Sequence, residues 1–245
     1  MFRFVSAFVL LVALSATVQA EDKRVALVIG NSKYANVVSL KNPVNDAADM
    51  SAALSRLGFN VTTLTNGTAN DTRKALATFA EKTKAALISL VFYSGHAVES
   101  GGVTWLVPVD GRAESLSSIT RDAISLDRLL ESMSDVRDAA IVFIDATRND
   151  PYPGEKLAIA NNSTPAIPGN VLIGFATRAG GSVADGADRN SPYTAALLKH
   201  IEAQRVSLQK IMIRVRDDVM TATKREQQPF VYGSFSEDIF LRRED

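Results

Sequence analysis

The stretch ALISLVFYSGHA, residues Ala86–Ala97, decides the fold class because it joins an apolar run to a short polar turn. The run Ala86–Tyr93 is strongly apolar, which is typical of a parallel strand buried on both faces. The turn Ser94–His96 follows at once and contains a glycine beside a histidine. Since functional sites of open parallel sheets lie beyond the carboxyl ends of the strands, the segment predicts a central strand with chemistry at its tip.

The same alternation of apolar runs and amphipathic segments continues along the chain. Further strands are predicted at Arg24–Gly30, Phe59–Leu64, Ala139–Ile144, Val171–Ala176 and Ser236–Leu241, with a hairpin arm at Val103–Val109. Helical spacing of apolar residues appears between Asn42 and Gly58 and at Asp71–Thr83, Ser125–Ser134, Ser191–Glu202 and Ser207–Thr223. Asn42 is expected to cap the first helix ahead of Pro43. This order predicts an α/β fold with about six mostly parallel strands and helices on both faces.

Composition excludes several classes of function. The 245 residues include 27 Lys+Arg and 27 Asp+Glu, so the formal net charge is zero, and we expect no nucleic-acid partner. The chain has no cysteine, which excludes disulfides, thiolate metal sites and a thiol nucleophile. No phosphate-binding glycine motif follows a strand, and two distant histidines with scattered carboxylates form no ligand set. We therefore predict neither a cofactor nor a metal.

The first residues, Met1–Ala20, have the pattern of a cleaved signal peptide. Arg3 is followed by the apolar run Phe8–Ala13 and then by small and polar residues up to Ala20. This run is too short to cross about 30 Å of hydrocarbon as a helix, although an uncleaved anchor remains an alternative. We expect a secreted or periplasmic protein that has no membrane contact after cleavage.

Two strand ends carry residues suited to catalysis. His96 follows the strand Ala86–Tyr93, and Thr147 follows the strand Ala139–Ile144. If these strands are neighbours, about 4.8 Å apart, the two side chains lie close together. A histidine facing a hydroxyl is the arrangement of a base and a nucleophile, but a histidine at a strand end also serves to bind the backbone.

A series of motifs, in order from Arg24 to about Leu241, closely resembles the bacterial caspase-like proteins of the peptidase C14 group, which are related to metacaspases and orthocaspases. The motifs are RVALVIGNSKY (24–34), LKNPVNDAADMSAALSRLGFNV (40–61), VFYSGHA (91–97), WLVPVD (105–110), IDATRND (144–150), GFATRAGGSVADG (174–186) and NSPYTAALL (190–198). The resemblance implies the caspase–haemoglobinase fold. It also implies a single domain over residues 21–245, with a p20-like part at about 24–150, a linker loop at about 150–169 and a p10-like part at about 170–245.

The resemblance also assigns roles to individual positions. His96 stands at the position of the catalytic base, although Ala97 replaces the glycine that follows it in the family. Thr147 stands where the family has its nucleophilic cysteine. Asp46 and Asp145 match the acidic S1 pocket, which in metacaspases recognises a basic residue. The resemblance thus implies a cleft for peptide or protein segments with basic residues.

The exchange of cysteine for Thr147 decides which activity we expect. A thiol with a pKa of about 8.5 is readily deprotonated beside a histidine, whereas a threonine hydroxyl is far more basic and its β-branch crowds the site. We therefore expect an inactive pseudopeptidase that keeps its acidic cleft. Two alternatives remain: an active endopeptidase that cleaves after Arg or Lys with Thr147 and His96, and an interaction module with no open cleft. Ion pairs that bury both Asp46 and Asp145 would favour the module.

Overall fold

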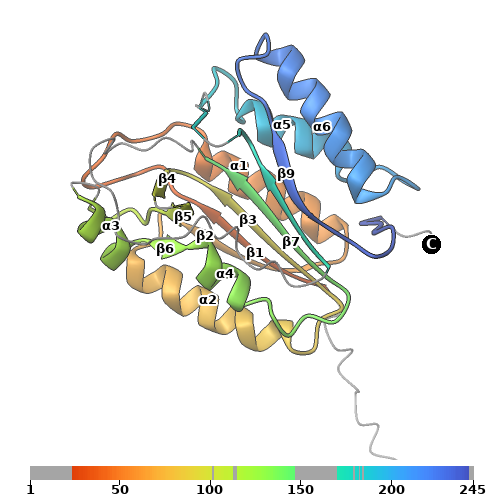
Figure 1. Cartoon of the computed structure of the whole chain (residues 1–245), viewed down its shortest axis with the longest axis horizontal. Coiled ribbons are helices and arrows are strands. Elements are labelled where there is room, and N and C mark those ends of the chain that lie inside the picture. The colour runs from red at the N-terminus through yellow and green to blue at the C-terminus, as the bar shows by residue number, and fades with distance from the viewer. Residues whose placement is uncertain are drawn as a thin grey trace, which may run out of the picture.

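The computed structural model describes residues 24–100, 102–112, 115–146, 170–178, 180–181, 183 and 185–242. Its strands are β1 (Arg24–Gly30), β2 (Asn60–Thr65), β3 (Ile88–Ser94), β4 (Ala97–Ser100), β5 (Val103–Leu106), β6 (Ile124–Ser125), β7 (Ala139–Asp145), β8 (Val171–Phe175) and β9 (Phe230–Ser234). Its helices are α1 (Pro43–Arg56), α2 (Ala69–Thr83), α3 (Leu116–Asp122), α4 (Leu126–Glu131), α5 (Pro192–His200) and α6 (Leu208–Ala222). Figure 1 shows their arrangement.

A six-stranded sheet in the order β2-β1-β3-β7-β8-β9 forms the centre of the molecule (Figure 1). Neighbouring strands pair in parallel except at β9, which pairs antiparallel with β8. The predicted α/β fold with a mostly parallel six-stranded sheet is therefore confirmed. Strands β4, β5 and β6 form a second, antiparallel sheet of three strands.

The helices cover both faces of the large sheet, as expected. Helices α1, α5 and α6 pack on one face, where Leu90 and Phe92 of β3 meet them in one hydrophobic core. Helices α2 and α4 cover the opposite face, which receives Val91 and Tyr93. Because successive side chains of a strand point to opposite faces, burial on both sides makes β3 and β7 apolar along nearly their whole length.

The prediction of a final strand at Ser236–Leu241 is wrong. The last strand is β9. Its sequence gives only a weak strand signal, because its three apolar residues are followed at once by Gly233, which has a φ of +89°. A Cβ at Gly233 would lie 2.0 Å from the Val171 carbonyl oxygen, so close pairing with β8 requires glycine there. Only residues 239–241 of that segment are apolar, and Leu241 is buried in the core outside any strand.

Several shorter features differ from the predictions, and two predicted segments fall on residues that the structure does not describe. Asn42 precedes α1 as predicted, but its side chain makes no cap hydrogen bond. Helix α3 and strands β4 and β6 were not expected at all. The predicted signal peptide Met1–Ala20 and the predicted linker loop at about 150–169 both lie outside the described residues. Within the described residues, no helix is both long and apolar enough to cross a membrane.

Gly30 lets α1 begin directly on top of the sheet. A Cβ at this position would lie 2.3 Å from the Pro43 carbonyl oxygen and 2.6 Å from the Ala47 Cβ. Both distances are far below van der Waals contact, so any side chain would push the first turn of α1 away from β1. Close packing of this helix end therefore depends on a glycine at the last residue of β1.

We predict that Gly30→Ala destabilises the fold by about 3 kcal/mol, because the backbone of α1 cannot yield to a methyl group without loss of packing. Urea unfolding followed by circular dichroism measures the change. Gly58→Ala is the control: it has open space but a φ of +79°, and about 1 kcal/mol is expected from backbone strain alone. A smaller loss for Gly30→Ala than for Gly58→Ala would contradict the packing argument.

Candidate functional site

The carboxyl ends of β1, β3 and β7 bring three small or polar residues into one row. Gly30 pairs with Ser94, and Ser94 pairs with Asp145 in the parallel register. Ser94 and Asp145 continue the alternation that places Phe92 and Phe143 on the face of α1, α5 and α6. Their side chains therefore point toward the amino ends of α1 and α5, which begin at this edge of the sheet.

Asp46, in the first turn of α1, is fully buried above this row. Its Oδ2 accepts a hydrogen bond of 2.9 Å from Ser94 Oγ. Its Oδ1 accepts two hydrogen bonds of 3.1 Å, from Asn190 Nδ2 and from the backbone N–H of Ser191. The carboxyl is thus held by β3 below it and by the segment that enters α5 beside it.

Asp145, at the last position of β7, is 4% exposed and is held by hydroxyl groups. Its Oδ2 accepts hydrogen bonds from Ser191 Oγ and, at 2.6 Å, from Thr194 Oγ1. Ser191 is the N-cap of α5, because its Oγ also accepts a hydrogen bond from the Thr194 N–H at 3.0 Å. One serine therefore contacts both aspartates, Asp46 through its backbone and Asp145 through its side chain.

We call Asp46 and Asp145 the acidic pair. Burial raises the pKa of Asp46 to about 7, and the nearby charge of Asp145 adds to the rise. Burial likewise raises the pKa of Asp145 to about 6, with a further contribution from the charge of Asp185. The hydrogen bonds from Ser94, Ser191 and Thr194 work in the opposite direction by stabilising the ionised forms. The pair therefore titrates close to neutral pH.

No lysine or arginine of the described ranges forms an ion pair with either carboxyl of the acidic pair. Arg189, which directly precedes Asn190 and Ser191, instead pairs with Asp49 through two contacts of 2.8 Å. Two buried carboxyls without a counter-ion are a costly arrangement unless they stay protonated or meet a cation from outside. The arrangement expected for a sealed interaction module, with ion pairs at both aspartates, is absent from this part of the chain.

A cavity of about 50 Å³ opens beside the acidic pair. Polar groups and apolar side chains both line it: Leu40, Pro43, Asp46, Ser94, Gly95, His96, Asp145, Ala146, Val183, Asp185 and Ser191. A water molecule takes up roughly 30 Å³ in the liquid, so the cavity has room for one or two small polar groups. His96 and the acidic pair thus share one cleft.

His96 is held on three sides. Its ring packs against the Tyr34 ring with centroids 4.6 Å apart, and its backbone N–H donates to the Tyr34 hydroxyl at 2.7 Å. Its Nε2 lies 2.7 Å from the Val38 carbonyl oxygen. Since a carbonyl only accepts hydrogen bonds, this contact requires a proton on Nε2, and the neutral ring keeps its lone pair on Nδ1. Such a ring can act as a base through Nδ1.

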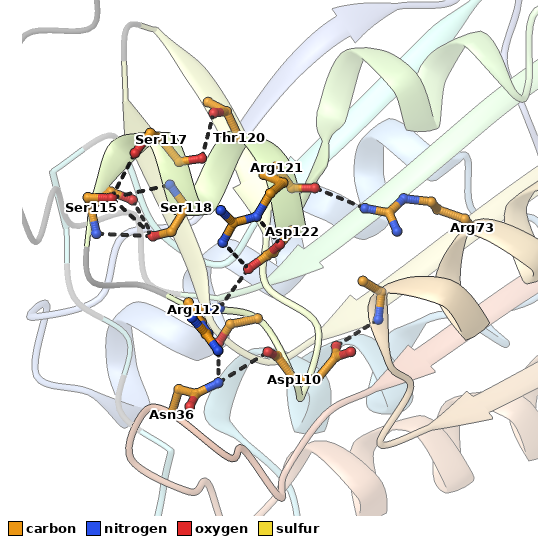
Figure 2. Close-up of polar contacts among 12 residues, drawn as sticks. Asn36, Arg73, Asp110, Arg112, Ser115, Ser117, Ser118, Thr120, Arg121 and Asp122 are labelled. Atoms are coloured by element: carbon orange, nitrogen blue, oxygen red, sulfur yellow. Dashed lines mark hydrogen bonds and ion pairs between the residues drawn. The ribbon is translucent and has the colours of Figure 1, made fainter.

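The loop that presents Val38 is tied to the body of the domain. Ala35 N–H donates to the Val109 carbonyl at 2.8 Å, and Asn36 Nδ2 donates to the Asp110 carbonyl at 3.1 Å. Asp110 in turn accepts a hydrogen bond of 2.7 Å from the Ala69 N–H at the start of α2 (Figure 2). These contacts fix the carbonyl that orients His96.

The structure brings together His96, Asp46 and Asp145, as the sequence predicted for one site. Thr147, the fourth predicted residue, lies outside the described residues. The sequence reasoning gave no role to Ser191 and Asn190, although both belong to the motif NSPYTAALL, whose serine and proline have the pattern of a helix start.

Asp185, which also lines the cavity, anchors the segment that leads into α1. Its carboxylate accepts hydrogen bonds from the backbone N–H groups of Lys41 and Asn42. These contacts hold the chain just before α1, whereas a first-turn N–H of the helix, that of Val44, donates to Ser32 Oγ at 3.3 Å instead of to Asn42. Among the described residues, no cluster of three or more His, Cys, Asp or Glu could hold a metal ion.

Comparison with known proteins identifies the family. The sequence model of the caspase domain, peptidase C14, matches residues 23–240. The chain belongs to the caspase family. It is 28% identical over 159 residues to the human mucosa-associated lymphoid tissue lymphoma translocation protein 1, covering 64% of this chain and 19% of that protein. The mouse homologue aligns at the same identity, with 18% of its length covered. The match thus spans about a fifth of these curated relatives.

A solved structure supports the same fold. Caspase-1 from Spodoptera frugiperda superimposes with a TM-score of 0.69 at 17% sequence identity, over 91% of each chain. At this identity the likeness establishes the fold alone. The caspase fold implied by the sequence motifs is therefore confirmed.

We predict that Asp46→Asn abolishes most of the pH dependence of stability between pH 5 and 8. The folded-state pKa of Asp46, about 7, exceeds the unfolded value of about 3.9, so the native state binds more protons and wild-type stability falls as pH rises through this window. The variant keeps an oxygen for Ser191 and Asn190, and we expect it to be about 1–3 kcal/mol more stable than wild type at pH 8.

Urea unfolding at several pH values between 5 and 8 measures this difference. Asp49→Asn is the matched control on the same helix, because Arg189 lowers the pKa of Asp49 and its contribution is constant across the window. Equal pH slopes for wild type and Asp46→Asn would refute the assignment.

Proposed function

We propose that this chain is an exported caspase-family protein that binds peptide segments through a basic side chain and does not cleave them. The observation that carries the proposal is the acidic pair, two buried carboxyls that line a cavity and form no ion pair with a described lysine or arginine. A lysine or arginine side chain entering the cavity would supply the missing positive charge. Export rests on the signal-like segment Met1–Ala20.

Lack of cleavage rests on the residue at the nucleophile position. The family motif places Thr147 where a cysteine would attack the peptide bond. A threonine hydroxyl needs a base, an orienting group and oxyanion donors arranged around it, and its methyl group restricts its rotation. His96 is oriented by a backbone carbonyl, which holds the ring without the negative charge that an aspartate would supply.

The oriented ring of His96 also favours the alternative function, an endopeptidase that uses Thr147 as its nucleophile. Base catalysis requires a nitrogen lone pair that can accept a proton, and Nδ1 of His96 offers one. In both functions the acidic pair has the same role, recognition of a basic residue. They differ only in whether the bound peptide leaves intact.

We predict that the purified protein binds a capped alanine tetrapeptide with one basic residue more tightly than the same peptide with norleucine. Affinity should rise about tenfold from pH 5 to pH 8, because the raised pKa values leave the acidic pair neutral at the lower pH. Titration calorimetry measures the binding. Asp145→Asn should abolish binding of the basic peptide, and Asp49→Asn should retain it. Equal binding of the basic and norleucine peptides would contradict the proposal.

We predict that Thr147→Cys creates hydrolysis of coumarin peptides that end in Lys or Arg, at least about a hundredfold above wild type, because only the nucleophile is missing. Thr147→Ser controls for the lost methyl group and should stay inactive. His96→Ala in the Thr147→Cys background should remove the gained activity. Turnover by the wild type that disappears in Thr147→Ala would establish the endopeptidase instead.

A further inference from the structure

The oxygens of the acidic pair are unequally engaged by the protein. A carboxylate oxygen accepts hydrogen bonds through two lone pairs. Asp46 Oδ1 uses both, for Asn190 Nδ2 and the Ser191 N–H, each at 3.1 Å. Asp46 Oδ2 accepts only from Ser94 Oγ at 2.9 Å. One lone pair of Asp46 is therefore open, and it lies on the oxygen that faces Ser94.

Asp145 shows a sharper division between its oxygens. Asp145 Oδ2 accepts two hydroxyl hydrogen bonds, from Ser191 Oγ and from Thr194 Oγ1. Asp145 Oδ1 accepts no hydrogen bond from any described residue, although the side chain is only 4% exposed and lines the cavity. A nine-tenths buried carboxyl thus keeps one oxygen for a partner that enters the cleft.

Lysine and arginine place different demands on such an arrangement. A guanidinium pairs best with a carboxylate through two parallel hydrogen bonds, which need an open lone pair on both oxygens of one carboxylate. In Asp46 and in Asp145, one of the two oxygens is already filled. A lysine ammonium is a compact group with three donors, and it can use single oxygens of two different carboxyls.

We propose that the cleft selects a lysine ammonium over an arginine guanidinium, with Asp145 Oδ1 and Asp46 Oδ2 as its acceptors. The cavity of about 50 Å³ agrees with this choice, because an ammonium brings one heavy atom to the acceptors and a guanidinium brings a plane of four. Leu40, Pro43 and Val183 line the same cavity and offer apolar contact to the methylene stem. Thr194 and Ser191 act as specificity-determining residues, since their hydroxyls occupy Asp145 Oδ2. This inference rests on the proposed function.

Matched peptides test the selectivity directly. Capped alanine tetrapeptides that differ only in one residue, lysine, arginine or norleucine, are titrated into the purified protein at pH 8 by calorimetry. We expect the lysine peptide to bind at least about tenfold more tightly than the arginine peptide. Acetylation of the lysine, which removes the charge and two donors, should reduce binding to the level of norleucine.

A variant tests the assigned cause. Thr194→Val keeps the shape of a fully buried residue but frees one lone pair of Asp145 Oδ2, so the arginine peptide should gain affinity and the ratio should fall to about threefold or less. Thr72→Val is the control. Thr72 is a buried threonine like Thr194, but it lies on α2 and its hydroxyl donates to a backbone carbonyl instead of to the acidic pair. If Thr194→Val does not fold, Asn190→Ala, which frees one lone pair of Asp46 Oδ1, serves the same purpose.

The outcomes separate the two proposals. Equal or tighter binding of the arginine peptide to wild type overturns the lysine selectivity and leaves the proposed function standing. A lysine preference that survives both Thr194→Val and Asn190→Ala overturns the assignment of the acceptor oxygens. Failure of both basic peptides to exceed norleucine overturns the proposed function and the selectivity together.

Discussion

The parallel register of β1, β3 and β7 is the constraint on which the rest of the site depends. It aligns Gly30, Ser94 and Asp145 across three strands at their carboxyl ends. Gly30 admits the first turn of α1 close to the sheet, and this turn carries Asp46 to hydrogen-bond distance of Ser94. A slip of one residue would turn Asp145 toward the face of α2 and α4 and separate the acidic pair.

Burial of two carboxyls at this edge opposes folding, and the local structure offsets only part of that effect. Both α1 and α5 begin here, so the partial positive charge of their amino ends favours negative groups. Three hydroxyls, a backbone N–H and the Asn190 side-chain amide donate to the acidic pair. The pKa values of both aspartates nevertheless stay raised, which means that desolvation outweighs these contacts. A site in this state gains stability from any cation that enters it.

The sequence was sufficient for the framework and for part of the site. The central strands were predictable because burial on both faces makes β3 and β7 continuous apolar runs. Strand β9 was missed because its apolar run is only three residues long and ends at Gly233. His96 was found because it follows such a run. The bridging role of Ser191 was not predictable, since it depends on α5 returning to α1 and β7 from a distant part of the chain. A contact between residues so far apart has no local signal.

The contacts of Ser191 bear on why binding and cleavage can be separated in this fold. Asp46 comes from α1, Asp145 from β7, and their supporting donors come from β3 and α5. None of these contacts uses the side chain at position 147, which follows β7 by two residues in the sequence. His96 is likewise held by Tyr34 and Val38, on a loop anchored elsewhere. In the proposed function, a threonine at position 147 takes the place of the attacking residue while the contacts that shape the acidic pair come from other residues, so selection for binding alone would preserve the cleft.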